Sequence, residues 1–134
     1  MGRTVITPIQ KRFDDIDIFH HVNNVHQQQY FDLGKGDYFQ SLLGHDVVSG
    51  QLRLVTASTH TDYLGQIRYE DDLVVSTTVE KIGNKSLTLL QRLVCRTEQG
   101  EDIRSESRSV MVAFDFEKQL SVEIPLVWRQ AFER

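Results

Sequence analysis

Four long runs rich in Val, Thr, Leu and Phe fill the second half of the chain and restrict its fold more than any other feature. Each run has about ten residues or more, against five or six in an ordinary strand, so the runs predict unusually long strands. Polar turns at 83–85 and 98–101 separate the last three runs, which is typical of antiparallel hairpins. The runs are 52–64, 72–82, 87–97 and 103–116.

The first half of the chain predicts one strand and one long helix. Residues 4–13 mix β-branched and polar residues, and Pro8 indicates a sheet edge or a bulge. Across residues 24–43 the apolar residues recur with helical spacing, and Gly44 follows as a helix-ending residue. After the four long runs, Pro125 opens a short helix over 126–133.

Two glycines inside the predicted long helix bear on its packing. Gly34 and Gly36 each cost about 1 kcal/mol relative to alanine in a helix interior. We therefore expect both to lie where a surrounding sheet approaches the helix closely. One helix facing a long, curved antiparallel sheet is an α+β architecture, and we expect a single domain over residues 1–134.

Composition and charge exclude several classes of function. The net charge of −4, with no surplus of Lys and Arg on any stretch, argues against a nucleic-acid partner. The single cysteine, Cys95, lies in an apolar run and is expected to be a buried, inert thiol. We see neither a signal segment nor a membrane-length apolar segment, so a cytoplasmic protein without a membrane partner is expected. No glycine-rich phosphate loop, metal-spaced histidine pair or serine elbow occurs, so no cofactor or metal is expected.

The polar segment 12–24 concentrates the groups that could carry chemistry. It holds three carboxylates, two histidines and two asparagines between a predicted strand and a predicted helix. A helix start offers free backbone N–H groups and a partial positive charge. Taken singly, however, Asn23 and Asn24 would be helix caps and Asp17 a turn residue. The residues alone leave both the catalytic and the structural interpretation open.

A contiguous motif runs from this segment into the predicted helix. Its members are Arg12, Phe13, Asp15, Asp17, His21, Val22, Asn23, Asn24, Tyr30, Phe31 and Asp32, with further matches at 62–64, 67–71 and 83–88. The motif resembles that of the hotdog-fold thioesterases related to 4-hydroxybenzoyl-CoA thioesterase. This resemblance implies a hotdog fold, a long central helix wrapped by a five-stranded antiparallel sheet. It also implies hydrolysis of an acyl-CoA thioester by a homodimer or homotetramer with its sites at subunit interfaces.

The resemblance also implies roles for particular residues. Thioester hydrolysis needs a carboxylate that attacks the carbonyl or activates water, and donors for the oxygen that becomes negative. Asp17 is implied as general base or nucleophile, His21 as its orienting group, and the N–H groups near Asn24 as the donors. For His21 a purely structural hydrogen-bonding role stays equally open. Substrate binding is expected from His20, Asn23, Asp32, Tyr63, Arg68 and Lys85.

Several positions depart from the family pattern. His20 replaces a glycine, which bears on the loop if that position needs a positive φ. Asp32 replaces a glutamate, and we expect it to anchor the helix, as we expect Asp15 to fix the loop. Residues 27–29 are three glutamines, which makes the helix start more polar than in the family.

Other functions remain alternatives to acyl-CoA hydrolysis. They are hydrolysis of an acyl carrier protein thioester, a hotdog hydratase, and a non-enzymatic acyl-CoA-binding module. For the coenzyme A phosphates, Arg68, Lys81 and Lys85 are candidates, although solvated surface charge is the simpler interpretation of each. The acyl group, the choice between nucleophile and general base, and dimer against tetramer stay open at this point.

Overall fold

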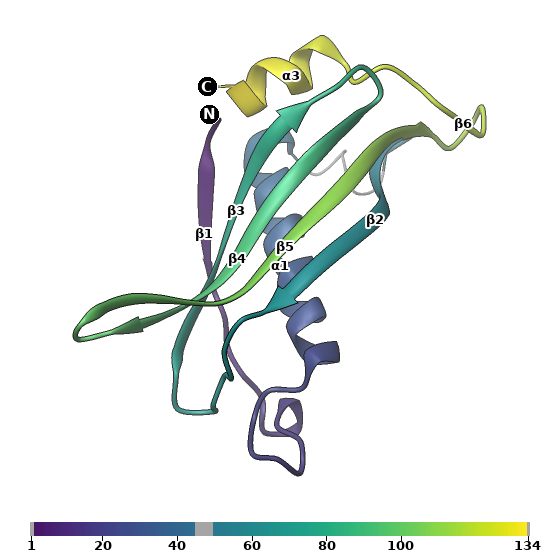
Figure 1. The fold of residues 1–134 in the computed structure, drawn as a ribbon. Coiled ribbons are helices and arrows are strands. Elements are labelled where there is room, and N and C mark those ends of the chain that lie inside the picture. Colours follow the sequence, from purple (N-terminus) through teal and green to yellow (C-terminus); the bar gives the residue numbers. More distant parts are fainter. Residues whose placement is uncertain (1, 45–49, 134) are drawn as a thin grey trace.

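The computed structural model describes residues 2–44 and 50–133, which form a long curved sheet with a helix along one face (Figure 1). The helices are α1 (Asn24–Leu43) and α3 (Leu126–Glu133). The expected hotdog arrangement is confirmed. No helix in these two ranges is long and apolar enough to cross a membrane. The strands are β1 (Thr4–Pro8), β2 (Leu52–Tyr63), β3 (Asp72–Ile82), β4 (Ser86–Thr97), β5 (Gly100–Asp115) and β6 (Leu120–Ser121).

The strand order places the longest free edge beside the helix start. The sheet runs β1-β3-β4-β5-β2, and every neighbouring pair is antiparallel. The short β6, a sixth strand beyond the five expected, pairs with the end of β5. Strand β2 therefore lies at one edge of the sheet and β1 at the other. Both chain ends lie beside α3, at the opposite end from the loop that precedes α1 (Figure 1).

The N-terminal strand is shorter than expected. Instead of continuing to Phe13, β1 ends at Pro8, and Phe13–Asp15 forms a 3-10 helix. The backbone N–H of Arg12 donates to Asp15 Oδ2 at 3.0 Å, so a local side-chain contact replaces strand pairing here. The expected bounds of α1 are confirmed, because Asn23 caps its start and Gly44 ends it with φ 85°.

Two apolar clusters pack between the sheet and the helices. The cluster at the C-terminal half of α1 includes the buried rings of Tyr38, Phe39 and Phe132, and Tyr38 stacks on Phe132 of α3 at 6.2 Å between ring centroids. The second cluster packs the N-terminal half of α1 against β3 and the loop before α1. Its buried members are Ile9, Val22, Tyr30, Phe31, Ile67, Leu73, Val75 and Leu93.

The two glycines of α1 behave differently. A Cβ added to Gly34 would lie 2.8 Å from Val75 Cγ1 and 2.9 Å from Gln91 Nε2, so the expected close approach is confirmed there. At Gly36 a Cβ would meet nothing within 4 Å, and the same expectation is wrong for that residue. Gly36 therefore lies on a side of the helix that the sheet does not approach closely.

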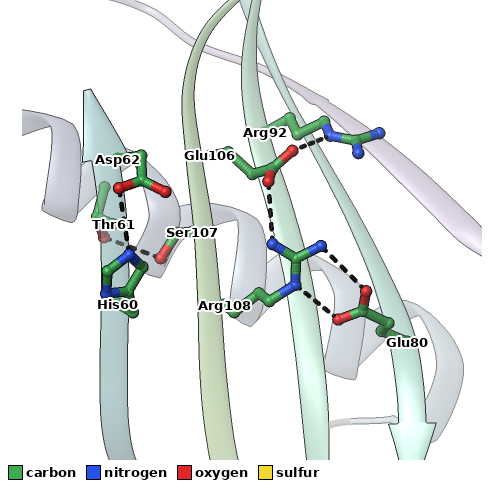
Figure 2. A network of polar contacts seen from close by, with 8 residues as sticks. All are labelled: His60, Thr61, Asp62, Glu80, Arg92, Glu106, Ser107 and Arg108. Carbon is green, nitrogen blue, oxygen red and sulfur yellow. Dashed lines mark hydrogen bonds and ion pairs between the residues drawn. The ribbon is translucent and has the colours of Figure 1, made fainter. Parts of the chain in front are cut away.

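The face of the sheet opposite α1 carries charged side chains joined in a network (Figure 2). Arg108 of β5 forms a two-bond pair with Glu80 of β3, at 2.9 and 3.1 Å, and donates to Glu106 at 3.0 Å. Arg92 of β4 donates to the other oxygen of Glu106 at 2.7 Å, and this bond lowers the pKa of Glu106 below its ordinary value. The network joins β3, β4 and β5 across the outer face.

Candidate active site

Asp15 fixes the polar loop to helix α1. Its side chain is fully buried and accepts hydrogen bonds from Arg12 N–H at 3.0 Å and from the Tyr30 hydroxyl at 2.5 Å. Its backbone carbonyl accepts the N–H of Asn23. Burial alone would raise the pKa of Asp15, but the bonds from Arg12 and Tyr30 and the charge of Arg12 outweigh it and lower that pKa. The geometry agrees with the expected loop-fixing role.

Asp17 begins a tight turn that leads back to the helix. His20 N–H donates to the Asp17 carbonyl at 3.0 Å, and Asp17 N–H donates to the His21 carbonyl at 3.0 Å. Phe19 N–H donates to Asp17 Oδ1 at 2.9 Å. Within the residues the structure describes, the other carboxylate oxygen, Oδ2, has no hydrogen-bond or ion-pair partner. Half of the Asp17 carboxylate is thus left for a ligand or water.

His20 adopts the backbone conformation that a glycine would favour. Its φ is 65°, in the left-handed region. Histidine is among the residues that enter this region more readily than most, although still at a cost. The loop therefore keeps a positive φ at this position without glycine.

The start of α1 supplies backbone donors next to this turn. Asn23 Oδ1 accepts Val25 N–H at 2.7 Å, and the Asn23 carbonyl accepts Gln27 N–H at 3.0 Å. Asn24, the first helical residue, belongs to the positions whose N–H has no intrahelical acceptor. Its N–H and the positive end of the helix dipole can therefore serve an oxyanion.

Two cavities adjoin the turn and the helix start. The first, which we call the loop cavity, has a volume of about 670 Å³ and is lined by Phe13, Ile16, His20, His21, Arg68, Tyr69 and Glu70. The second, the helix cavity, has about 330 Å³ and is lined by His21, Val22, Asn24, Gln27, Tyr63, Leu64, Gly65 and Gln66. Because His21 borders both, one bound molecule could extend from one cavity into the other.

Arg104 holds the segment 64–71, which contributes to both cavities. Its backbone carbonyl accepts the N–H groups of Leu64 and Gly65 at 2.9 and 3.0 Å. Its guanidinium donates to Gln66 O and, at 3.2 Å, to Asp71 Oδ2. Arg104, a half-buried residue that sequence reasoning missed, thus supports a wall of each cavity.

The structure brings together most of the residues expected at the site. Five of them line at least one of the two cavities: His20, His21, Asn24, Tyr63 and Arg68. Asn23 caps the helix beside them.

Three expected residues lie elsewhere. Asp17 itself lines neither cavity, although its backbone is hydrogen-bonded to the backbones of His20 and His21, which do. Asp32 points to solvent and pairs with Lys35 at 3.6 Å, so it contacts its own helix rather than the sheet. Lys85 is exposed in the turn between β3 and β4, and this turn lies near α3, far from the start of α1 within one chain (Figure 1).

Two glutamines at the helix start are site residues that sequence reasoning did not select. Gln27 is buried and lines the helix cavity, and Gln28 Nε2 donates to Thr61 and to Tyr63 at 2.9 Å each. The signal for them was the polar run 27–29 in the first turns of a helix that otherwise faces a core.

Comparisons with known proteins identify related chains. A family model described as the thioesterase-like superfamily matches residues 12–132. The uncharacterized protein YsmA of Bacillus subtilis (strain 168) is 34% identical over 83 residues, which are 60% of this chain and 54% of that protein. This chain thus matches about half the length of that curated relative.

Solved structures share the fold over nearly the whole chain. A predicted thioesterase from Bacillus stearothermophilus is 27% identical with a TM-score of 0.84, over 97% of this chain and 94% of that one. A mutant of 4-hydroxybenzoyl CoA thioesterase complexed with 4-hydroxybenzoyl CoA has a TM-score of 0.88, over 98% of this chain and 100% of that one. At 16% identity, the second likeness concerns the fold alone.

Proposed function

The chain belongs to the thioesterase-like superfamily, and from this premise we propose that it hydrolyses an acyl-CoA thioester to a free carboxylic acid and coenzyme A. In the proposal Asp17 is the catalytic carboxylate, His21 orients the attacking group, and the N–H groups at the start of α1 polarise the thioester carbonyl. The solved thioesterase in complex with 4-hydroxybenzoyl CoA supports coenzyme A as the carrier.

The contrast between Asp15 and Asp17 carries the proposal. Asp15 is fully buried, and both of its carboxylate oxygens are engaged by Arg12 and Tyr30. Asp17 is half-buried, and among the described residues only Phe19 N–H donates to its side chain. Two carboxylates two residues apart thus have different environments, one suited to structure and the other to chemistry.

The proposed reaction needs few groups. The carbonyl oxygen of the thioester accepts the N–H of Asn24, which makes the carbonyl carbon more electrophilic. Asp17 takes a proton from water while the water oxygen bonds to that carbon. The C–S bond then breaks, and the proton moves from Asp17 to the departing thiolate.

A covalent route uses the same carboxylate. Asp17 would bond directly to the carbonyl carbon and expel the thiolate, and water would then open the resulting mixed anhydride. Rapid acid quench of a single turnover with acyl-labelled substrate distinguishes the routes, because only the anhydride route leaves labelled acyl group bound to the protein.

We assign the coenzyme A arm to the loop cavity. Arg68 supplies a cation there, and the exposed rings of Phe13 and Tyr69 offer stacking surfaces. Because a phosphate contact acts equally on bound substrate and transition state, Arg68→Ala should raise KM about tenfold and leave kcat within about twofold.

We propose that two copies associate through β2. This strand has 12 residues and a free edge, and its exposed middle is small and polar. A long unpaired edge favours pairing with another strand, and a twofold axis is the commonest way to close such an assembly. Ala57→Lys, at the bulge of β2, should shift the sedimenting mass from dimer to monomer.

The test of the function is thiol release from a panel of acyl-CoA thioesters. Asp17→Asn should lower kcat by about a hundredfold or more, the scale of a lost general base. Asp14→Asn is the matched control, because Asp14 is exposed on the same loop and lines neither cavity. Equal rates for the two variants would remove Asp17 from the mechanism. Binding of acyl-CoA without any turnover would instead support a binding module.

A further inference from the structure

Resting on the proposed function, we infer that the acyl group is small and carries a hydroxyl or keto oxygen, rather than being a long alkyl chain. Asn24 lines the helix cavity and not the loop cavity. The thioester carbonyl that meets the start of α1 must therefore lie in the helix cavity. The acyl group next to it is then surrounded by the walls of the helix cavity, whose chemistry selects the substrate.

Gln28 closes the space between α1 and β2 beside this cavity. Its Nε2 donates to Thr61 Oγ1 and to the Tyr63 hydroxyl oxygen, each at 2.9 Å. Thr61 is in turn hydrogen-bonded to Ser107 of β5 at 3.0 Å, on the sheet face opposite the charged network (Figure 2). An alkyl chain running along the helix would have to break this bridge.

Hydroxyl groups also form the layer beneath Gln27. The Ser105 hydroxyl donates to Gln27 Oε1, and both residues are almost fully buried. Ser107 and Ser109 continue this layer along β5. Apolar chains gain little against such a surface, because buried amides and hydroxyls that lose their partners are costly. The polar layer thus offers no apolar tunnel for a long chain.

Tyr63 supplies the donor that would recognise the acyl oxygen. Its hydroxyl oxygen accepts from Gln28, and no acceptor for its own proton lies within residues 2–44 and 50–133. The ring is 45% exposed and lines the helix cavity. A volume of about 330 Å³ is near the lower limit for ligand sites. Size and the free donor together favour a small oxygen-bearing acyl group.

The test compares coenzyme A thioesters paired by carbon skeleton: 3-hydroxybutyryl with butyryl, and 4-hydroxybenzoyl with benzoyl, with octanoyl and palmitoyl added. The oxygenated member of each pair should have a kcat/KM about tenfold higher, since only it can accept the proton of the Tyr63 hydroxyl. Octanoyl- and palmitoyl-CoA should be turned over more slowly than either pair.

Two variants locate the preference. Tyr63→Phe should bring the ratio of the two kcat/KM values within each pair close to one. Gln28→Leu should raise kcat/KM for octanoyl-CoA, relative to that for butyryl-CoA, by about tenfold. Gln130→Leu, the same substitution on the exposed side of α3, should leave the ratios as they are. Calorimetric titration of Asp17→Asn with the same thioesters should show the preference in Kd without turnover.

Each outcome separates this inference from the proposed function. Fastest hydrolysis of octanoyl- or palmitoyl-CoA overturns the inference and leaves the thioesterase standing. No hydrolysis of any thioester overturns the proposed function. Equal Kd values within both pairs overturn the inference whatever the turnover.

Discussion

The two flanks of α1 differ in chemistry although they belong to one helix. The flank toward β1, β3 and β4 is close and mainly apolar: Phe31 is buried there, and a Cβ added to Gly34 would lie 2.8 Å from Val75 Cγ1. The flank toward β5 and β2 is polar, and longer side chains span it. Gln28 reaches Thr61, and Lys35 lies 3.5 Å from Thr56.

This difference indicates that one flank of α1 mainly stabilises the fold and the other mainly serves substrate recognition. Burial of apolar area stabilises the fold, so the close flank should hold most of the stability. The polar flank gives less stability because each hydrogen bond there replaces one to water. It faces the free edge strand and the helix cavity, where adjustable polar contacts suit substrate recognition.

The largest expected contrast is between a core residue and a polar residue of α1. Phe31→Ala should lower the free energy of unfolding by about 3–5 kcal/mol, because it removes a buried ring and leaves a cavity. Gln28→Ala should cost less than about 1 kcal/mol. Urea denaturation of both variants measures the difference, and similar losses would contradict these different roles of the two flanks.

A somewhat smaller effect is expected where the loop meets the close flank. Asp15→Asn should cost about 2–3 kcal/mol at neutral pH, the range for hydrogen bonds to a charged group. The native pKa of Asp15 is lowered, so the carboxylate stabilises the fold above its unfolded pKa of about 3.9. That contribution is lost as pH falls through the lower native value.

The pH dependence gives the control for this variant. Wild type and Asp15→Asn should differ most near neutral pH and converge in acid, as followed by urea denaturation across the range. A difference that stays constant with pH would mean that the charge of Asp15 is not what the loop uses.

Alanine substitutions at the two glycines of α1 should change the stability of the protein in opposite directions. Gly34→Ala should cost about 1–2 kcal/mol, because its Cβ would overlap the side chains of β3 and β4. Gly36→Ala should stabilise the protein by about 0.5–1 kcal/mol, since open space surrounds that position. If both substitutions moved the thermal unfolding midpoint in the same direction, the helix would not be packed more closely on the Gly34 side than on the Gly36 side.

The smallest expected effect concerns the loop before α1. His20→Gly should stabilise the protein by about 0.5–1 kcal/mol, because glycine adopts φ 65° without the steric cost of a side chain, offset in part by its greater freedom when unfolded. Chemical denaturation checks this gain. A loss of stability would mean that the imidazole makes a stabilising contact in solution.

Local signals explain which elements could be predicted from the sequence. Helix α1 was predictable from end to end, because Asn23, its apolar spacing and Gly44 all act within a few residues. The bounds of β3 follow equally from its own composition. The early end of β1 was not predictable, since the Asp15 carboxylate that accepts the N–H of Arg12 also accepts the Tyr30 hydroxyl of α1, a contact that no pattern near β1 encodes.

The site was predictable only where the family motif fixes it. The cluster of His21, Asn24 and Arg68 around two cavities needs segments that the sequence separates by more than 40 residues, and the resemblance supplied that link. The partnership of Gln28 with Thr61 and Tyr63 depends on the distance between α1 and β2. No pattern within either segment encodes that distance.

The most direct test separates binding from chemistry at Asp17. We expect Asp17→Asn to bind a non-hydrolysable thioether analogue of acyl-CoA with a Kd within about threefold of the wild-type Kd, both measured by calorimetry. Its kcat on the thioester should fall by about a hundredfold or more. Unchanged turnover in a variant that binds normally would contradict a catalytic carboxylate at this position.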